Sequence, residues 1–98
     1  MDINRALRTV VATGKVYIGS DQTAKAVKKG EAKLVILAAN NPHGAAILEN
    51  SNKKGIPVYE FPGKGTELGP ACGKPFPVGV LAVVDAGESD ILQLAKGR

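Results

Sequence analysis

The chain has 98 residues, a formal net charge of +4, a hydrophobic share of 44% and a charged share of 22%. These values exclude a disordered chain and leave room for one domain. The longest apolar run, residues 34–39, is far shorter than the ~20 residues that span a bilayer, so we expect no membrane contact.

The predicted elements alternate between helical and strand periodicity. We expect, in chain order, a helix that ends at Gly14, a strand over 15–18, a helix from Ser20 to Gly30, a strand over 33–39, a helix from Asn41 to Gly55, a strand over 58–61, a short helix capped by Thr66, an extended loop over 74–78, a strand over 80–84 and a helix near 88–94.

Several details of these elements can be predicted as well. Ser20 is expected to cap the second helix, in which Ala24 and Val27 face inward. Asn41 is expected to cap the third helix, with Pro42 at its first position. Residues 34–37 are apolar without alternation, which indicates a central strand covered on both faces. The order of elements predicts an α/β fold with helices on both sides of one sheet.

The positive charge is unevenly distributed along the chain. Residues 1–56 hold nine Lys or Arg against four acids, whereas residues 57–98 hold four against five. Lys25, Lys28 and Lys29 share one helical face by their spacing. This asymmetry favours a polyanionic partner, because clustered Lys and Arg release counterions from phosphates, and the simpler alternative is a solvated charged surface.

No residue pattern points to catalysis, a cofactor or a metal. His43 is the only histidine and Cys72 the only cysteine, so a zinc site and an internal disulfide are both excluded. We interpret Cys72 as a small buried side chain and His43 as a surface residue. The glycines of residues 63–73 lack the spacing of a phosphate loop and are expected to shape a turn. Acidic residues near 88–90 fit the start of a helix.

Three loops are candidates for an RNA site. Residues 19–25 join a strand to a helix N-terminus, where amides can bind an anion. Residues 39–41 close the central strand with asparagines, which can donate to and accept from base edges. Residues 76–78 carry Phe76 between two prolines, where it could stack on an unpaired base. The third loop can share an edge with the others only if the last strand runs antiparallel.

Four blocks carry a resemblance to a known family. They are KVYIG at 15–19, AKLVILAAN at 32–40, ELG at 67–69 with ACGK at 71–74, and VDAGESDIL at 84–92. In this order they resemble the archaeal and eukaryotic L30e family of large-subunit ribosomal proteins, within the kink-turn-binding superfamily. The resemblance covers nearly the whole chain. It implies a three-layer α/β/α sandwich around a mixed four-stranded sheet, with residues 1–98 as a single kink-turn RNA-binding domain.

The resemblance also implies the RNA contacts and their chemistry. Backbone amides and Asn40 would read tandem sheared G·A pairs, Phe76 and Val78 would pack against an extruded base, and Lys25 would neutralise crowded phosphates. The implied RNA-binding residues are Gly19, Ser20, Thr23, Lys25, Asn40, Asn41, Phe76 and Val78. The chain departs from the family pattern at Asp21, Ala45 and Pro77, where basic side chains are common in the family.

We therefore expect a non-enzymatic structural component of the large ribosomal subunit that binds ribosomal RNA at a kink-turn. The resemblance implies a cytoplasmic protein of the ribosome, a monomer when free, with other ribosomal proteins as further partners and no small-molecule substrate. One alternative is a kink-turn binder in the ribonucleoproteins that guide RNA modification. Another is a small α/β nucleotide-binding protein that uses residues 63–73.

Overall fold

The structure is a computed structural model that describes residues 3–39, 41–89 and 91–92. Helices and strands alternate along the described chain, as the periodicity predicts. The helices are α1 (Ile3–Thr13), α2 (Ser20–Lys28), α3 (Gly44–Lys53) and α4 (Gly65–Ala71). The strands are β1 (Lys15–Ile18), β2 (Leu34–Leu37), β3 (Val58–Glu60) and β4 (Val80–Asp85).

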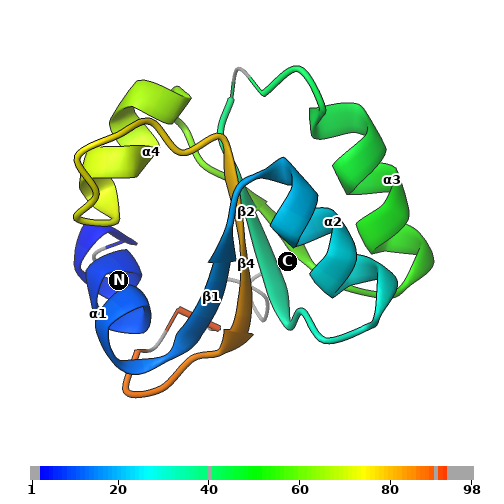
Figure 1. Cartoon of the computed structure of the whole chain (residues 1–98), viewed down its shortest axis with the longest axis horizontal. Helices are drawn as coiled ribbons and strands as arrows, with labels where there is room; N and C mark the ends of the chain where they lie inside the picture. Colours follow the sequence, from blue (N-terminus) through cyan, green and yellow to red (C-terminus); the bar gives the residue numbers. More distant parts are fainter. Residues whose placement is uncertain (1–2, 40, 90, 93–98) are drawn as a thin grey trace.

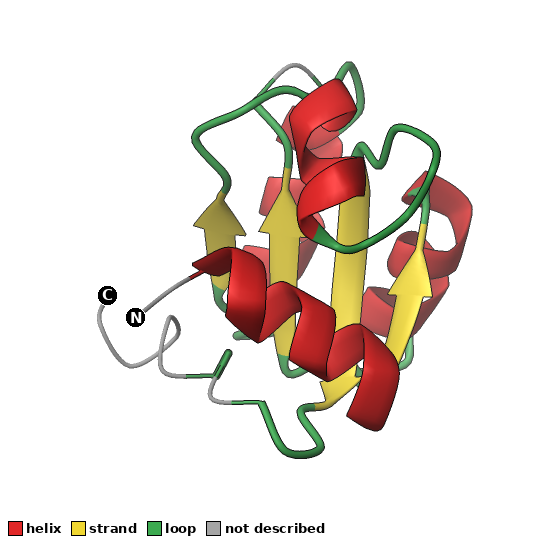
Figure 2. Ribbon diagram, turned by 90° about the vertical axis from the view of Figure 1, so that its left-hand side faces the viewer, coloured by secondary structure: helices red, strands yellow, loops and turns green. Residues whose placement is uncertain are grey.

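The strands form one mixed sheet in the order β1-β4-β2-β3. Strand β4 runs antiparallel to both of its neighbours, β1 and β2, whereas β2 and β3 are parallel. Strands β1, β2 and β3 therefore all point the same way, and β4 starts where they end. Figure 2 shows this sheet with helices in front of it and behind it. The expected α/β/α sandwich with a mixed four-stranded sheet is confirmed.

Helices α1 and α4 cover one face of the sheet, and α2 and α3 cover the other (Figure 1). The two faces correspond to two buried clusters. Leu34, Ile36, Leu81 and Val83 point to the α1 and α4 side. Their neighbours along the strands, including Val35, Leu37, Val80 and Ala82, point to the α2 and α3 side. All four residues of β2 are buried, which confirms the central strand expected from its apolar run.

Several expected helix details are wrong, and local geometry explains why. Helix α2 begins at Ser20 itself, because Gly19 at φ 103° turns the chain directly from strand to helix. With this phase, Ala26 and Val27 face inward and Ala24 is exposed. Helix α4 has Lys64 at its N-cap, so Thr66 lies inside the helix rather than capping it.

The third helix starts at Gly44, two residues after the expected position. The side-chain oxygen of Asn41 accepts a hydrogen bond from the His43 amide at 2.8 Å, which folds residues 41–43 into a turn before the helix. Asn41 thus prepares the helix start without being its cap. Gly55, at φ 70°, follows the last turn as expected.

The expected helix near 88–94 is absent from the part of this segment that the structure describes. Residues 86–89 form a turn, in which Gly87 adopts φ 58° and its amide donates to the Asp85 carboxylate at 2.9 Å. Residues 90 and 93–98 lie outside the described residues. None of the described helices combines the length and apolar character needed to cross a bilayer.

Candidate nucleic-acid interface

One edge of the sheet gathers the three loops that the sequence singles out. This edge, which we call the loop edge, consists of residues 19–23 after β1, the described residues 38, 39 and 41 after β2, and residues 76–79 before β4. Because β4 is antiparallel to β1 and β2, the start of β4 lies between the ends of the other two strands. The condition for the Phe76 loop to share this edge is therefore met.

Backbone hydrogen bonds join the three segments at the loop edge. The amide of Gly19 donates to the carbonyl of Val80 at 2.9 Å, and the amide of Ala38 donates to the carbonyl of Gly79 at 2.9 Å. The side-chain amide of Asn41 donates to the same Gly79 carbonyl at 3.1 Å. Residues 79 and 80 thus connect the end of β1 to the end of β2, and the relative positions of the three loops are set by the sheet.

The expected RNA-binding residues differ in exposure. Phe76 is 49% exposed and is the exposed large hydrophobic side chain among the described residues. Thr23 and Val78 are buried, at 0% and 1%. The Val78 side chain belongs to the core cluster that also contains residues of α4, so Phe76 is the exposed side chain of the two that were expected to pack against an extruded base.

Asn40 lies outside the described residues, and both of its neighbours belong to the loop edge. Asn41 uses its side chain within the protein, since its oxygen accepts from His43 and its nitrogen donates to Gly79. These two bonds hold the Asn41 side chain in place against Gly79 and His43. Lys25 is exposed in the second turn of α2, and Ser20 is the first residue of that helix.

The first turn of α2 provides donors at the loop edge. Backbone amides in the first turn of a helix have no partner within the helix and carry the positive end of its dipole. Thr23 already donates its amide to the carbonyl of Gly19 at 3.0 Å. Asp21 adds an exposed carboxylate in the same turn. The edge therefore favours contact with neutral acceptors of a base more than dense contact with phosphates.

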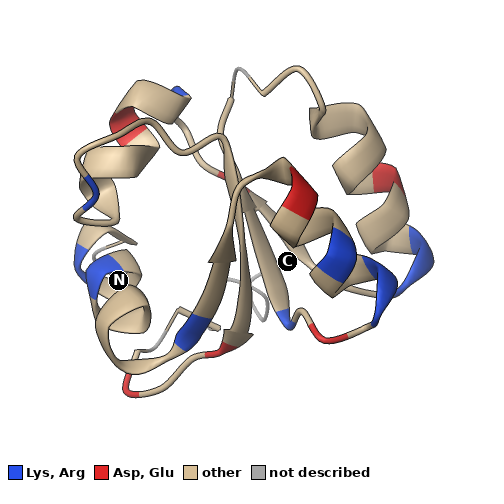
Figure 3. Ribbon diagram, in the orientation of Figure 1, with Lys and Arg blue, Asp and Glu red and all other residues tan. Residues whose placement is uncertain are grey.

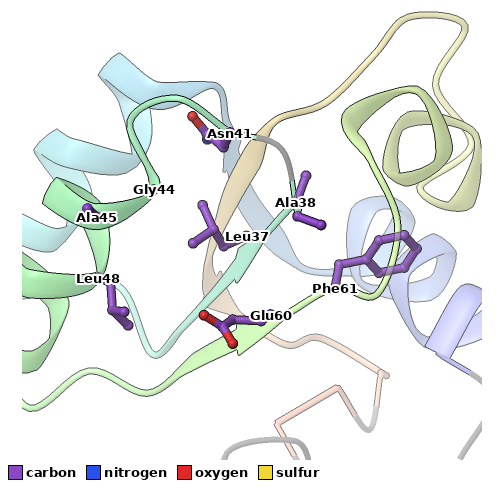
Figure 4. A pocket seen from close by; sticks show the side chains of 9 residues that line it. Leu37, Ala38, Asn41, Gly44, Ala45, Leu48, Glu60 and Phe61 are labelled. Carbon is purple, nitrogen blue, oxygen red and sulfur yellow. The ribbon is translucent and has the colours of Figure 1, made fainter.

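A recess of about 440 Å³ opens beside the loop edge (Figure 4). Sequence reasoning missed it, because its walls come from the ends of β2 and β3 and the start of α3. In Figure 4, the side chains of Leu37, Leu48 and Glu60 lie toward one another, and the Phe61 ring points away from them. The residues around it are Leu37, Ala38, Ala39, Asn41, Gly44, Ala45, Leu48, Glu60 and Phe61. The exposed Glu60 carboxylate disfavours a phosphate here.

Two glycines of residues 63–73, Gly65 and Gly69, have a different role from the expected turn, whereas Gly73, at φ 80°, lies in a turn after α4 as expected. Gly65 and Gly69 lie on one face of α4, where residues 74–78 pack directly against the helix backbone. The amide of Val78 donates to the carbonyl of Gly65 at 3.0 Å, and the amide of Lys74 donates to the carbonyl of Gly69 at 2.9 Å. A β-carbon at Gly69 would overlap the carbonyl oxygen of Phe76.

This packing also argues against the nucleotide-binding alternative. The Glu67 carboxylate accepts the amide of Lys64 at 3.4 Å, so an acidic group lies where a phosphate would have to bind. The described residues contain no group of three or more His, Cys, Asp or Glu side chains that could hold a metal ion.

Cys72 is buried between α1 and α4, as the sequence predicts. Burial raises the pKa of its thiol to about 11, because a thiolate is poorly solvated there, and the positive charge of Lys74 opposes part of this rise. A thiol with such a pKa is a poor nucleophile at neutral pH.

Comparison with known proteins places this architecture in a family. Residues 1–93 match the model of the ribosomal protein L7Ae/L30e/S12e/Gadd45 family. A protein of Methanocaldococcus jannaschii named large ribosomal subunit protein eL30 is 50% identical over the whole of this chain and 91% of its own length. The protein of the same name from Methanospirillum hungatei is 46% identical over 98% of this chain and 100% of its own. A third, from Methanosarcina mazei, is 46% identical over 94% of this chain and 87% of its own.

Proposed function

This chain belongs to the ribosomal protein L7Ae/L30e/S12e/Gadd45 family, and from that premise we propose that it is a structural component of the large ribosomal subunit that binds ribosomal RNA at a kink-turn. In this function the protein has no enzymatic activity. It holds a sharply bent RNA element against the loop edge.

The convergence of three loops on one edge is the observation that carries the proposal. Gly19, Ala38 and Asn41 are joined through residues 79 and 80, which also connect to the Phe76 loop. Binding then requires little ordering of the protein, which lowers the entropic cost of forming the complex. An interface preformed in this way suits an RNA of defined, unusual shape.

Each part of the loop edge has a chemical role in the proposal. Backbone amides near Gly19 and the side chain of Asn40 would contact the edges of sheared G·A pairs, whose donors and acceptors differ from those of Watson–Crick pairs. Phe76, exposed at the tip of its loop, would stack on an unpaired base. The recess beside Asn41 is weakly apolar and offers space for a neutral group rather than a phosphate.

Gel-shift titration tests the proposal with a kink-turn RNA and a second RNA in which Watson–Crick pairs replace its G·A pairs. We expect tight binding of the first RNA and markedly weaker binding of the second. In addition, Asn40→Ala should lower the affinity for the kink-turn by ~1 to 3 kcal/mol, as expected for a lost base contact. Asn52→Ala is the matched control, because Asn52 is exposed near the far end of α3.

Equal affinity for the two RNAs would overturn the proposed kink-turn recognition. Equal titration curves for Asn40→Ala and Asn52→Ala would remove Asn40 from the interface. Sedimentation of the protein in a cell extract tests the cellular part of the proposal. Migration with large subunits supports a ribosomal role. Migration with small guide RNAs would instead indicate that the same interface binds RNA in a modification complex.

A further inference from the structure

A second surface concentrates positive charge at the opposite end of the sheet. Figure 3 shows basic positions gathered over the ends of α2 and α3, away from the loop edge. We call this surface the basic edge, and it consists of Lys28, Lys29, Lys33, Lys53 and Lys54. Two acids, Glu31 and Glu49, lie within the same segments. The basic edge therefore carries a net charge of about +3, most of the +4 of the whole chain.

The topology of the fold brings these lysines together from three separate segments. Helices α2 and α3 both start at the loop edge, run back along the same face of the sheet and contact each other. Their last turns, with Lys28 and Lys53, therefore end at the edge where β2 begins. Lys33 directly precedes β2 and adds to the same end of the molecule.

The charges of the basic edge are largely unneutralised. All five lysines are exposed. Among the described residues, only Lys53 has an ion-pair partner, Glu49, at 3.4 Å, and both side chains are 69% exposed. An ion pair so exposed contributes little to stability, and Lys53 can exchange Glu49 for another anion. The surface thus has several cations available to a polyanion.

Stabilisation of the helix ends explains only part of this arrangement. A lysine in the last turn of a helix interacts favourably with the helix dipole, which accounts for Lys28 and Lys53. Lys29, Lys33 and Lys54 lie beyond the helices, where further like charges repel one another. The loop edge itself bears Asp21 and is bordered by Glu60, so the charge distribution does not follow the proposed kink-turn site.

We propose that the basic edge is a second RNA-binding surface, which takes the backbone phosphates of an RNA helix separate from the bent element at the loop edge. The two edges are separated by the length of β2, from Lys33 to Ala38, which is roughly 17 Å at the rise of a strand. Lysine ammonium groups on flexible stems suit contacts to phosphates without reading sequence. The domain would then connect two RNA segments, a role beyond recognition of one kink-turn.

Salt-dependent titration of a regular 20-base-pair RNA duplex without a kink-turn tests the second surface. The triple variant Lys28→Gln, Lys29→Gln and Lys54→Gln should reduce the magnitude of the slope of log K against log salt by about 2 to 3. Each lost phosphate contact lowers that magnitude by ~0.7 to 0.9. The matched control is Arg8→Gln, Lys64→Gln and Lys74→Gln, which removes the same charge from α1 and from the two ends of α4, on the other face of the sheet. The control should change the slope by less than ~1.

A competition experiment separates this proposal from the kink-turn function. Wild-type protein saturated with a kink-turn RNA should still bind the labelled duplex and form a ternary complex. Displacement of the duplex by the kink-turn RNA, or equal slopes for the triple variant and its control, would overturn the second surface. If wild-type protein binds the duplex through the basic edge but does not distinguish the kink-turn RNA, the second surface stands and the kink-turn proposal fails.

Discussion

Single residues at the loop edge act mainly by holding other segments in place. Gly19 occupies φ 103°, which only glycine adopts without strain, and nothing lies within 4 Å of the position that a β-carbon would take. Its importance is therefore conformational rather than steric. Asn41 is bonded at both ends of its side chain, which fits a residue that positions the 39–41 segment.

Cys72 gives a prediction at the scale of one residue. Its pKa is about 11 in the folded protein, whereas an unburied thiol titrates near 9.0. The folded state therefore keeps its proton at a pH where the unfolded state has lost it. The free energy of unfolding should be unaffected by this group below pH 9, and should fall as pH rises from about 9 to about 11, by up to about 2 to 3 kcal/mol.

Urea unfolding of wild type and Cys72→Ala at several pH values between 8 and 11 measures this effect. All other groups are the same in both proteins, so the difference in stability between the two isolates the thiol. Cys72→Ala should be less stable than wild type at pH 8 because packing around the side chain is lost. The difference in free energy of unfolding between the two proteins should become smaller toward pH 11, because only wild type loses the contribution of the thiol. A gap that stays constant over this range would show that the thiol titrates alike in both states.

At the scale of elements, α4 and the loop before β4 form one unit. Gly65 and Gly69 bring the helix backbone into contact with residues 76–78, and the amides of Lys74 and Val78 are bonded to the helix carbonyls. This contact holds the loop that presents Phe76 at the loop edge. The region that resembles a phosphate loop in sequence is thus a helix that supports another loop.

Gly69→Ala should therefore both destabilise the protein and weaken RNA binding. The new methyl group would overlap the Phe76 carbonyl, so the loop must shift, at an expected cost of ~1 to 3 kcal/mol in the free energy of unfolding. Gly44→Ala is the matched control, because its β-carbon would meet the Leu37 side chain at an ordinary 3.4 Å. It should be neutral, or stabilising by up to about 1 kcal/mol.

Urea denaturation compares the stabilities of these two variants with wild type. A kink-turn titration of Gly69→Ala, at a temperature where it remains folded, then reports the position of the Phe76 loop. Asn52→Ala is the control for binding, because Gly44 borders the recess beside the loop edge. If the free energy of unfolding of Gly69→Ala lies within ~0.5 kcal/mol of the wild-type value, the close packing of the loop on α4 is not required for stability.

At the scale of the whole molecule, the sheet connects two ends of different character. One end carries the loops with neutral donors and an exposed aromatic ring, and the other carries exposed lysines. Both cores lie between these ends, one on each face of the same four strands. A ligand bound at either end therefore opposes unfolding of the entire domain.

Hydrogen exchange can measure this coupling over the whole fold. With kink-turn RNA free at 100 times its Kd, the folded state gains about 2.7 kcal/mol, so amides that exchange only by global unfolding should slow about 100-fold. Exchange should slow for the amides along the full length of β2 and β4. The RNA without G·A pairs, at the same concentration, should protect them less. Slowing confined to the loop edge would mean that the two ends unfold independently.

The alternation of elements, the buried central strand and the family resemblance can all be predicted from the order of the residues alone. These depend on local signals: apolar periodicity, glycines after helices and motif blocks that need no knowledge of distant contacts. The starts of α2 and α3 also depend on contacts between residues far apart in the chain, because the Gly19 amide donates to Val80 and the Asn41 side chain to Gly79.

Which loops share an edge, and where the charge lies relative to them, depends on how the strands pair in the folded molecule. The antiparallel direction of β4 places the Phe76 loop beside Gly19, and the direction of α2 and α3 carries their lysines to the opposite end. The family resemblance implies that Thr23 and Val78 contact RNA, but the fold buries both side chains. Strand order and direction depend on pairing between distant segments, which no local pattern of residues encodes.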